Sequence, residues 1–353
     1  MTIELTLAAA LRDIDSPRPE IRGVATRNLA PALLDQLGLR PPAWWTRIEH
    51  EQRDAASEAL DRACDDPAPQ NAALARIGLA QLGAATAHAR AREALASDGD
   101  DPAAMFMREC GVIALSLLGA AARSLIEEPD VDGETRALAT EQLGRMLAEL
   151  LALLDDPRAD VRFQVGPSLI EVGGAALEPE LLAALEREQH EEVRSNLISS
   201  IALLDPPSAA ACDALVQVLA SDKGAGWLGW EAALALTTAR RPEGAPRLLA
   251  ALRSRETRDR ALEALAVLGE QAGPEAPAIV RRYTKGLLVP VFTKVRAAYA
   301  LARMIPDEGR ALLDRLAKHP RPAVREAVAE ARQHLEELAS ERDPTDRGAY
   351  RRG

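Results

Sequence analysis

Two pairs of adjacent carboxylates, Asp100-Asp101 and Asp155-Asp156, are the residues best suited to acid–base chemistry in this sequence of 353 residues. Carboxylates held close together shift each other's pKa and can divide the roles of general acid and general base. Each pair, however, is followed directly by a proline in a predicted turn. An aspartate in that position commonly caps the helix that the proline begins. We therefore interpret both pairs as helix caps and not as catalytic dyads.

The histidines and cysteines do not form a metal-binding pattern. No two of the five histidines lie three to five residues apart, and the sequence contains no C-x-x-C. A zinc site needs several convergent nitrogen or sulfur ligands. Glycine-rich phosphate loops and the nucleophile motifs of hydrolases are also missing. The sequence predicts a protein that is not an enzyme and that holds no metal and no cofactor.

The compartment is predicted from the cysteines and the N-terminus. Cys64, Cys110 and Cys212 are far apart and odd in number, so we expect buried thiols in a reducing compartment. Glu4 stands where a secretory signal would carry a basic residue, and no apolar run approaches the ~18 residues that a membrane span requires. We therefore expect a cytoplasmic protein with no membrane partner.

Basic side chains gather in the C-terminal third of a chain whose formal net charge is −11. Residues 127–160, the acidic middle, contain ten acids against three bases. Residues 240–303 contain thirteen bases against six acids, and no acid occurs between 276 and 306. We call residues 240–306 the basic third. Its charges either form solvated faces that balance acidic neighbours or line a groove for an acidic peptide or nucleic-acid phosphates.

Two tryptophans precede the basic third. Trp227 and Trp230 open a predicted helix, and side chains three residues apart share one face of a helix. They either fill the core where the chain's regular pattern is interrupted or form an exposed aromatic platform beside the basic third. The sequence leaves both interpretations open.

The elements that would position these residues repeat along the chain with a period of roughly 33 residues. Arg162 and Arg194 lie 32 residues apart, and Arg260 and Arg296 lie 36 apart. Each unit begins with a turn such as Asp156-Pro157, and aliphatic residues follow at helical spacing. Because no segment alternates strictly between apolar and polar residues, the pattern predicts stacked helix–turn–helix units and no strands.

The openings of these units resemble HEAT repeats, and are most similar to the short bacterial HEAT-like repeats named for phycobilisome lyases. The resemblance rests on the D-P-x-x-x-V-R motif that starts at Asp156 and on later Val-Arg pairs. It implies an all-α solenoid, a right-handed superhelix of about ten helical pairs over residues 1–339. The polar residues 340–353 would form a disordered tail. It also implies that one set of arginines pairs with acids of neighbouring repeats: Arg22, Arg162, Arg194, Arg296 and Arg325.

The predicted function is a non-catalytic scaffold or adaptor that binds a protein or peptide, for which an acidic partner would suit the basic third. The alternative is a HEAT-like nucleic-acid-binding protein, similar to alkylpurine DNA glycosylases, whose motif we cannot place on this chain. The acidic net charge disfavours nucleic acid, because such binding depends on neutralising many phosphates. The candidate contact residues are Gln164, Asn196, Trp227, Trp230, Arg281, Arg282, Lys285, Lys294 and Arg296.

Overall fold

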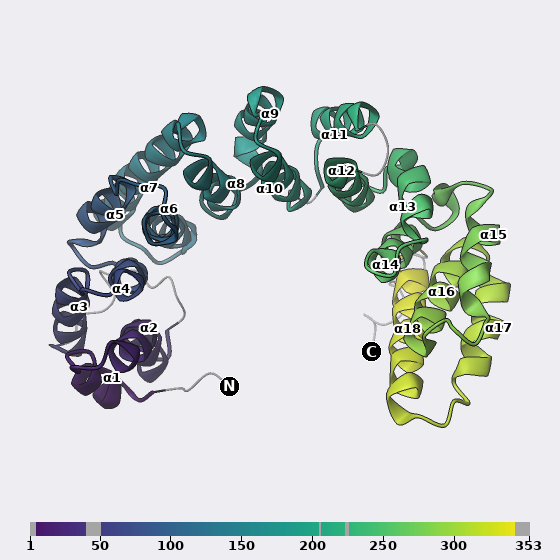
Figure 1. The fold of residues 1–353 in the computed structure, drawn as a ribbon, viewed down its shortest axis with the longest axis horizontal. Coiled ribbons are helices and arrows are strands. Elements are labelled where there is room, and N and C mark those ends of the chain that lie inside the picture. The colour runs from purple at the N-terminus through teal and green to yellow at the C-terminus, as the bar shows by residue number, and fades with distance from the viewer. Residues whose placement is uncertain (1–4, 40–50, 205, 223–225, 343–353) are drawn as a thin grey trace. The chain divides into compact units, whose positions relative to one another are not determined.

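The computed structural model describes residues 5–39, 51–204, 206–222 and 226–342. Within these ranges the chain consists of α-helices and short 3₁₀ turns, and no strand is present. The eighteen described α-helices follow one another as nine pairs joined by short turns (Figure 1). The predicted all-α solenoid of helical pairs is confirmed. The predicted tail starts at residue 340, but α18 continues to Arg342, and residues 343–353 lie outside the described residues.

Contacts divide the chain into two compact units, residues 1–200 and residues 201–353, which we describe separately. The helices of the first unit are α1 (Leu7–Asp13), α2 (Pro19–Gln36), α3 (Glu51–Ala63), α4 (Pro69–Leu82), α5 (Ala87–Leu95), α6 (Pro102–Glu127), α7 (Gly133–Ala152), α8 (Ala159–Gly173), α9 (Glu178–Arg187) and α10 (Glu191–Ala202). Those of the second unit are α11 (Ala209–Ser221), α12 (Trp227–Thr238), α13 (Ala245–Ala251), α14 (Arg258–Leu268), α15 (Ala276–Val280), α16 (Val291–Met304), α17 (Pro306–Leu316) and α18 (Pro322–Arg342).

The second helices of the pairs stack on one another within each unit. In the first unit α2 contacts α4, α4 contacts α6, and α6 contacts α8. In the second unit α12 contacts α14, α14 contacts α16, and α16 contacts α18. The first helices lie on the other side of each stack (Figure 1). Each pair buries its apolar stripe mainly against its neighbours. The buried residues of the second unit from Trp230 to Leu335 form one cluster, whereas the first unit also has a small separate cluster between α6 and α7.

The helices begin where capping residues and prolines were expected. The Asp101 carboxylate accepts hydrogen bonds from the backbone N–H groups of Ala103 (2.9 Å) and Ala104 (3.1 Å), and Pro102 is the first residue of α6. The Asp156 carboxylate accepts from the backbone N–H of Arg158 (2.9 Å) in the turn before α8. Asp101 therefore caps α6, as the sequence predicted, whereas Asp156 stabilises the turn before α8, whose N-cap residue is Arg158.

Helix α6 differs from the sequence-based expectation. It is long and apolar enough to cross a membrane, and 67% of its most apolar window is buried in the protein. From the sequence we expected no segment of this kind; α6 qualifies although Arg108 and Glu109 interrupt its apolar residues on one side and Arg123 on the other. Contacts with α4, α5, α7 and α8 cover the helix, so α6 is a central core helix of the first unit.

The predicted arginine pairs form between neighbouring helical pairs. The Arg22 guanidinium donates to both carboxylate oxygens of Asp66 (2.6 and 2.8 Å), and Arg162 donates in the same way to Glu188 (2.7 and 3.0 Å). Each arginine also donates to the backbone carbonyl six residues earlier, that of Ser16 or Asp156. A planar guanidinium suits this arrangement because it can serve a carboxylate and a carbonyl at once.

The remaining repeat arginines follow the prediction less closely. Arg296 pairs with acids of α14, as expected. Arg325 donates to the carbonyls of His319 and Pro320 (both 3.0 Å) but forms no ion pair within the described residues. The buried Nε of Arg194 has no hydrogen-bond partner there. The pairing rule therefore holds for Arg22, Arg162 and Arg296 and not for the other two.

A further arginine pair was not predicted. Arg108 is 1% exposed in α6, and its Nε donates to Asp160 of α8 at 2.7 Å. Its Nη1 donates to the carbonyls of Ser97 (3.0 Å) and Gly99 (2.7 Å). The buried charge is thus satisfied by the next helical pair and by the turn before its own helix.

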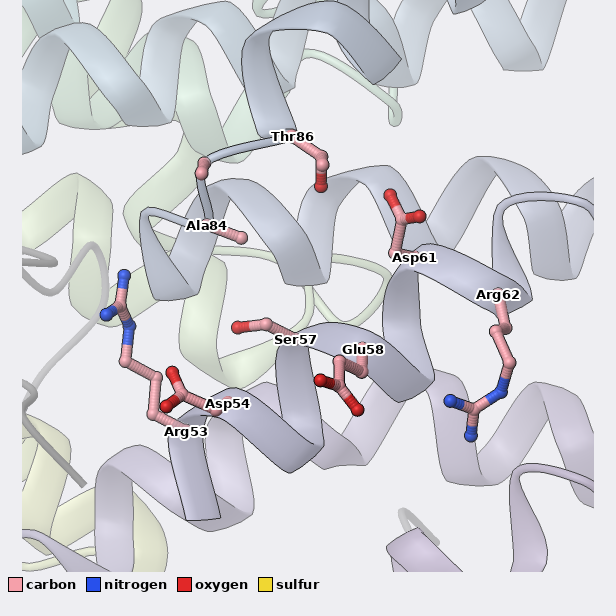
Figure 2. Close-up of a pocket in the computed structure, with 9 residues that line it drawn as sticks. Arg53, Asp54, Ser57, Glu58, Asp61, Arg62, Ala84 and Thr86 are labelled. Atoms are coloured by element: carbon pink, nitrogen blue, oxygen red, sulfur yellow. The ribbon is translucent and has the colours of Figure 1, made fainter. Parts of the chain in front are cut away.

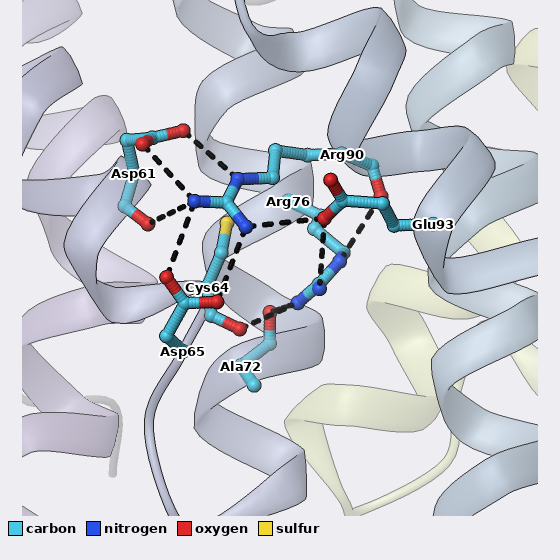
Figure 3. Close-up of polar contacts among 7 residues, drawn as sticks. All are labelled: Asp61, Cys64, Asp65, Ala72, Arg76, Arg90 and Glu93. Atoms are coloured by element: carbon cyan, nitrogen blue, oxygen red, sulfur yellow. Dashed lines mark hydrogen bonds and ion pairs between the residues drawn. The ribbon is translucent and has the colours of Figure 1, made fainter.

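The first helices carry a similar contact (Figure 3). Arg90 of α5 lies between Asp61 and Asp65 of the preceding pair, at 3.0 and 3.1 Å, and these acids raise its pKa. Beneath it the buried Arg76 donates to three backbone carbonyls, including that of Cys64 at 3.0 Å. Burial raises the pKa of the Cys64 thiol to about 12. Pairs α3/α4 and α5/α6 are therefore joined through polar contacts as well as apolar packing.

Candidate partner-binding site

Three consecutive second helices of the second unit line an open hollow of about 370 Å³. It lies between α14, α16 and α18, and we call it the aromatic hollow. Its walls are formed by Glu263, Phe292, Val295, Arg296, Tyr299, Ala327, Glu330, Ala331 and His334. Each residue is placed by helical periodicity, since positions 292, 296 and 299 share one face of α16.

Aromatic side chains give the hollow its apolar surface. The Phe292 side chain is 41% exposed at its rim. The rings of Tyr299 and His334 stack at 5.7 Å between centroids with 11° between their planes, and the Tyr299 hydroxyl lies 2.7 Å from His334 Nδ1. Burial raises the pKa of Tyr299, so its hydroxyl is protonated at neutral pH and can donate to Nδ1. This contact joins α16 to α18.

Charged groups on the walls are largely paired with one another. Arg296 donates from Nε to Glu263 at 2.7 Å and lies 3.3 Å from Asp259 through Nη1. The Thr293 hydroxyl donates to the other carboxylate oxygen of Asp259 at 2.8 Å. The half-buried guanidinium of Arg296 therefore stays oriented toward the hollow without a ligand.

A second hollow, of about 540 Å³, adjoins the first and shares Phe292 and Arg296 with it. We call it the basic hollow because Arg255 and Arg258 also line it, against the single acid Asp259. Arg258 donates to the carbonyl of Leu252 at 2.8 Å and lies 5.1 Å from the centre of the Tyr283 ring. Arg255 is exposed and forms no ion pair among the described residues. The two hollows offer an apolar surface beside positive charge.

The candidate residues of the basic third are separated by the structure. Arg296 lines both hollows. Lys294 is half-buried on α16 and forms no ion pair within the described part of the chain. Arg281 is held by Glu308 of α17 at 2.6 and 2.7 Å. Arg282 and Lys285 are exposed in the segment before α16 and line neither hollow. One candidate of these five therefore belongs to the site itself.

The two tryptophans have different environments. Trp227 is 53% exposed, whereas Trp230 is 4% exposed and belongs to the core of the second unit. The exposed platform of two tryptophans is therefore not formed, and the core interpretation holds for Trp230. Trp230 cannot contact a partner without leaving the core.

The other two candidates lie in the first unit. The Asn196 side chain donates to the backbone carbonyl of Phe163, and the carbonyl of Gln164 accepts from the Ser168 hydroxyl at 2.9 Å. Both residues are half-buried on second helices. Asn196 therefore has a structural partner, and neither residue lines the aromatic or the basic hollow.

Sequence reasoning missed Phe292, Tyr299 and His334 as contact residues. Phe292 and Tyr299 stand seven residues apart, which places them on one helix face, and this signal was available. His334 lies 35 residues after Tyr299, about one repeat later. The spacing of one repeat predicts a contact between Tyr299 and His334 only when the register of neighbouring repeats is known.

The first unit has a hollow of a different kind (Figure 2). This open hollow has a volume of about 580 Å³ beside α3 and the turn before α5, and Arg53, Asp54, Glu58 and Asp61 lie along one wall. Asp61 is already bound by Arg90, which is the main cause of its lowered pKa. The buried Arg53 Nε and Ser57 Oγ have no hydrogen-bond partner among the described residues. The wall is polar and carries no aromatic side chain, so this hollow lacks the aromatic surface beside an arginine that characterises the aromatic hollow.

Comparisons with known proteins give structural likeness alone. No protein-family model and no curated protein matches the chain. A crystal structure of Kap121p is similar at 14% identity with a TM-score of 0.42, covering 92% of this chain and 45% of that one. Kap121p bound to Ste12p is similar at 15% identity and a TM-score of 0.43, covering 92% and 44%. This chain spans less than half the length of either structure, and its own helical pairs identify it as an α-solenoid.

Proposed function

We propose that the second unit is a non-catalytic binding module that holds a segment of a partner protein against α14, α16 and α18, and that the chain acts as a scaffold or adaptor. The proposal rests on the aromatic hollow, which is walled by three consecutive second helices and has the partly exposed Phe292 at its rim. Exposed aromatic surface beside oriented arginine is typical of residues that dominate protein interfaces.

The chemistry of the two hollows suggests the kind of segment that binds. A hollow of about 370 Å³ accommodates an apolar or aromatic anchor side chain. The neighbouring basic hollow, with Arg255 and Arg258, favours carboxylates that flank the anchor. We therefore propose an acidic segment with an apolar anchor, as the charge of the basic third suggested.

Nucleic acid is supported less well. Trp230 is buried, and Arg281 and Arg296 are engaged by Glu308 and Glu263. Fewer cations are then free to neutralise phosphates. We also propose a reducing, cytoplasmic compartment, since Cys64, Cys110 and Cys212 are buried thiols that form no disulfide. The resemblance to bacterial HEAT-like repeats agrees with a binding role but does not indicate which partner is bound.

Selection of peptides from a displayed random library against the full chain tests the proposed function. We expect the selected peptides to combine an aromatic or large aliphatic residue with acids, and Phe292→Ser to weaken their binding at least tenfold, since hot-spot residues contribute about 2 kcal/mol or more. Arg255→Glu should weaken binding more at low than at high salt.

Leu138→Ser is the matched control, because Leu138 is an exposed apolar residue on α7 of the first unit. This variant should bind the selected peptides as the unmodified chain does. Selection of no peptide, or of peptides that bind equally well to Phe292→Ser, would contradict the proposal.

A further inference from the structure

The segment between the 3₁₀ turn Arg281–Thr284 and α16 carries two leucines that no described residue covers. Leu287 is 103% exposed and Leu288 is 96% exposed, whereas the other exposed large apolar side chains lie between 41% and 65%. The preceding Gly286 has φ +99°, a conformation that favours glycine and lets the chain turn sharply there. We call Leu287 and Leu288 the leucine tip.

Positive charge lies on both sides of the leucine tip. Arg282 and Lys285 precede it, are exposed and form no ion pair within the described ranges. Lys285 does lower the pKa of Glu308, although the Arg281 hydrogen bond is the main cause of that shift. On the other side, Arg255 and Arg258 line the basic hollow together with Pro290, two residues after the tip. With no acid between residues 276 and 306, the tip stands in a positive local field.

We propose that the leucine tip inserts into the headgroup region of an anionic lipid bilayer, while Arg282 and Lys285 lie against the lipid phosphates. A bilayer interface combines apolar chains with a layer of negative charge, which matches an apolar projection flanked by bases. The sequence predicted no membrane partner, and the exposure of this one loop is the reason for proposing a peripheral lipid contact.

Other occupants fit the tip less well. Nucleic acid offers phosphates but no apolar phase for two uncovered leucines. A pocket on a partner protein would have to be concave and apolar to receive the two leucines, and it would also need acidic residues at its rim to match the flanking bases. The net charge of −11 does not prevent approach, because charges more than about 8–10 Å apart are largely screened at physiological salt. The proposal is independent of the proposed function, since neither leucine lines the aromatic or the basic hollow.

Sedimentation of the full chain with vesicles tests the proposal. We expect binding to phosphatidylcholine vesicles that contain phosphatidylserine and much weaker binding to phosphatidylcholine alone. Leu287→Ser with Leu288→Ser should weaken binding on the order of tenfold or more. Arg282→Glu with Lys285→Glu should weaken it by about fivefold or more for each base, and chiefly at low salt.

Two variants of the first unit control for changes in hydropathy and charge. Leu138→Ser removes an exposed leucine and Arg92→Glu reverses an exposed arginine, far from the tip in sequence. Both should bind vesicles as the unmodified chain does. Melting temperatures of all variants should agree, because the leucine tip contributes no buried surface.

A fluorescent label reports insertion directly. The three native thiols are buried, so Leu288→Cys can be labelled selectively with an environment-sensitive dye. Its emission should shift to the blue when anionic vesicles are added. Absence of binding to anionic vesicles, binding that survives loss of both leucines, or a label that stays in water would each overturn the lipid contact. Tighter binding to duplex DNA that is insensitive to the leucines would also overturn it.

Discussion

The ion pair between Arg162 and Glu188 makes stability depend on pH in a calculable way. The Glu188 side chain is 7% exposed, and Arg162 donates to its two oxygens at 2.7 and 3.0 Å. The backbone N–H groups of Gln189 and His190 donate to it as well, at 2.9 and 2.8 Å. The Arg162 hydrogen bond, assisted by these backbone donors, lowers the pKa of Glu188 from 4.5 to about 2.

The sign of the effect follows from the lowered pKa. A carboxyl group whose pKa is lower in the folded state stabilises the fold above its unfolded pKa, and this stabilisation is lost as the pH falls toward the folded pKa. Here the window runs from pH 4.5 down to about 2. The difference between the unfolded and folded pKa of Glu188 contributes about 3 kcal/mol to the free energy of unfolding at pH 7. At pH 3 the contribution is less than half of that. Glu188→Gln should therefore cost about 2–3 kcal/mol at pH 7 and much less at pH 3.

Urea unfolding followed by far-ultraviolet circular dichroism at pH 7, 5 and 3 measures this difference. Hydrogen exchange at pH 7 should place the loss in α8–α10, because repeats are stabilised by their neighbours. Glu186→Gln is the control: it removes an exposed charge two residues away and should change stability little. A loss that is equally large at pH 3, or equally large in the Glu186 variant, would refute the reasoning.

Three further predictions concern the core. Trp230→Ala should lower the free energy of unfolding by about 3–5 kcal/mol, whereas Trp227→Ala should lower it by less than about 1 kcal/mol, as measured by urea unfolding. Gly309→Ala should destabilise the second unit strongly, because a Cβ would lie 2.0 Å from a backbone nitrogen of α16, and its melting temperature should fall. Cys64 and Cys110 should react with a thiol reagent only after unfolding, since burial raises both thiol pKa values to about 12.

Each of these predictions has a control within the chain. Gly133 has open space around it, so Gly133→Ala should leave the melting temperature nearly unchanged. Similar losses for the two tryptophan variants would contradict the different burial of the two side chains. Rapid modification of Cys64 in the folded protein at neutral pH would contradict its enclosure by α3 and α4.

The ion pairs of Arg22 and Arg162 were predictable because a local motif places both arginines. Arg22 and Arg162 both follow a proline turn, and the same turn supplies the carbonyl that each guanidinium binds. Arg108 lies in an apolar stretch of α6 and carries no such motif. Its partner Asp160 comes from the next helical pair, 52 residues later. Local periodicity cannot reveal a pair of this kind.

The candidate site was predictable only in part. Arg296 was identified because it belongs to the repeat, and Phe292 and Tyr299 share its helix face. His334 entered the site through the register between α16 and α18, which side-chain packing sets. The tryptophans remained undecided for a geometric reason: residues three apart on a helix differ by about 60° in direction, so the boundary between core and solvent can fall between them.

The arginine pairs of the first unit have a direction. On second helices the arginine belongs to the earlier helical pair and the acid to the later one, as in Arg22–Asp66 and Arg108–Asp160. On first helices the order is reversed, as in Arg90 with Asp61. In these contacts a helical pair meets its successor with a base on its second helix and an acid on its first, whereas His88 of α5 and Glu149 of α7 lie in the other order. We expect modules joined by such arginine pairs to stack in one direction.

The second unit uses the opposite order on its second helices. Arg260 pairs with Glu231 of the preceding pair, and Arg296 with Glu263. A helical pair moved from residues 1–200 into residues 201–353 would thus bring an arginine against an arginine. Lengthening this protein by duplicating modules should succeed within a unit and fail when modules are exchanged between units, so the two units define separate sets of interchangeable parts.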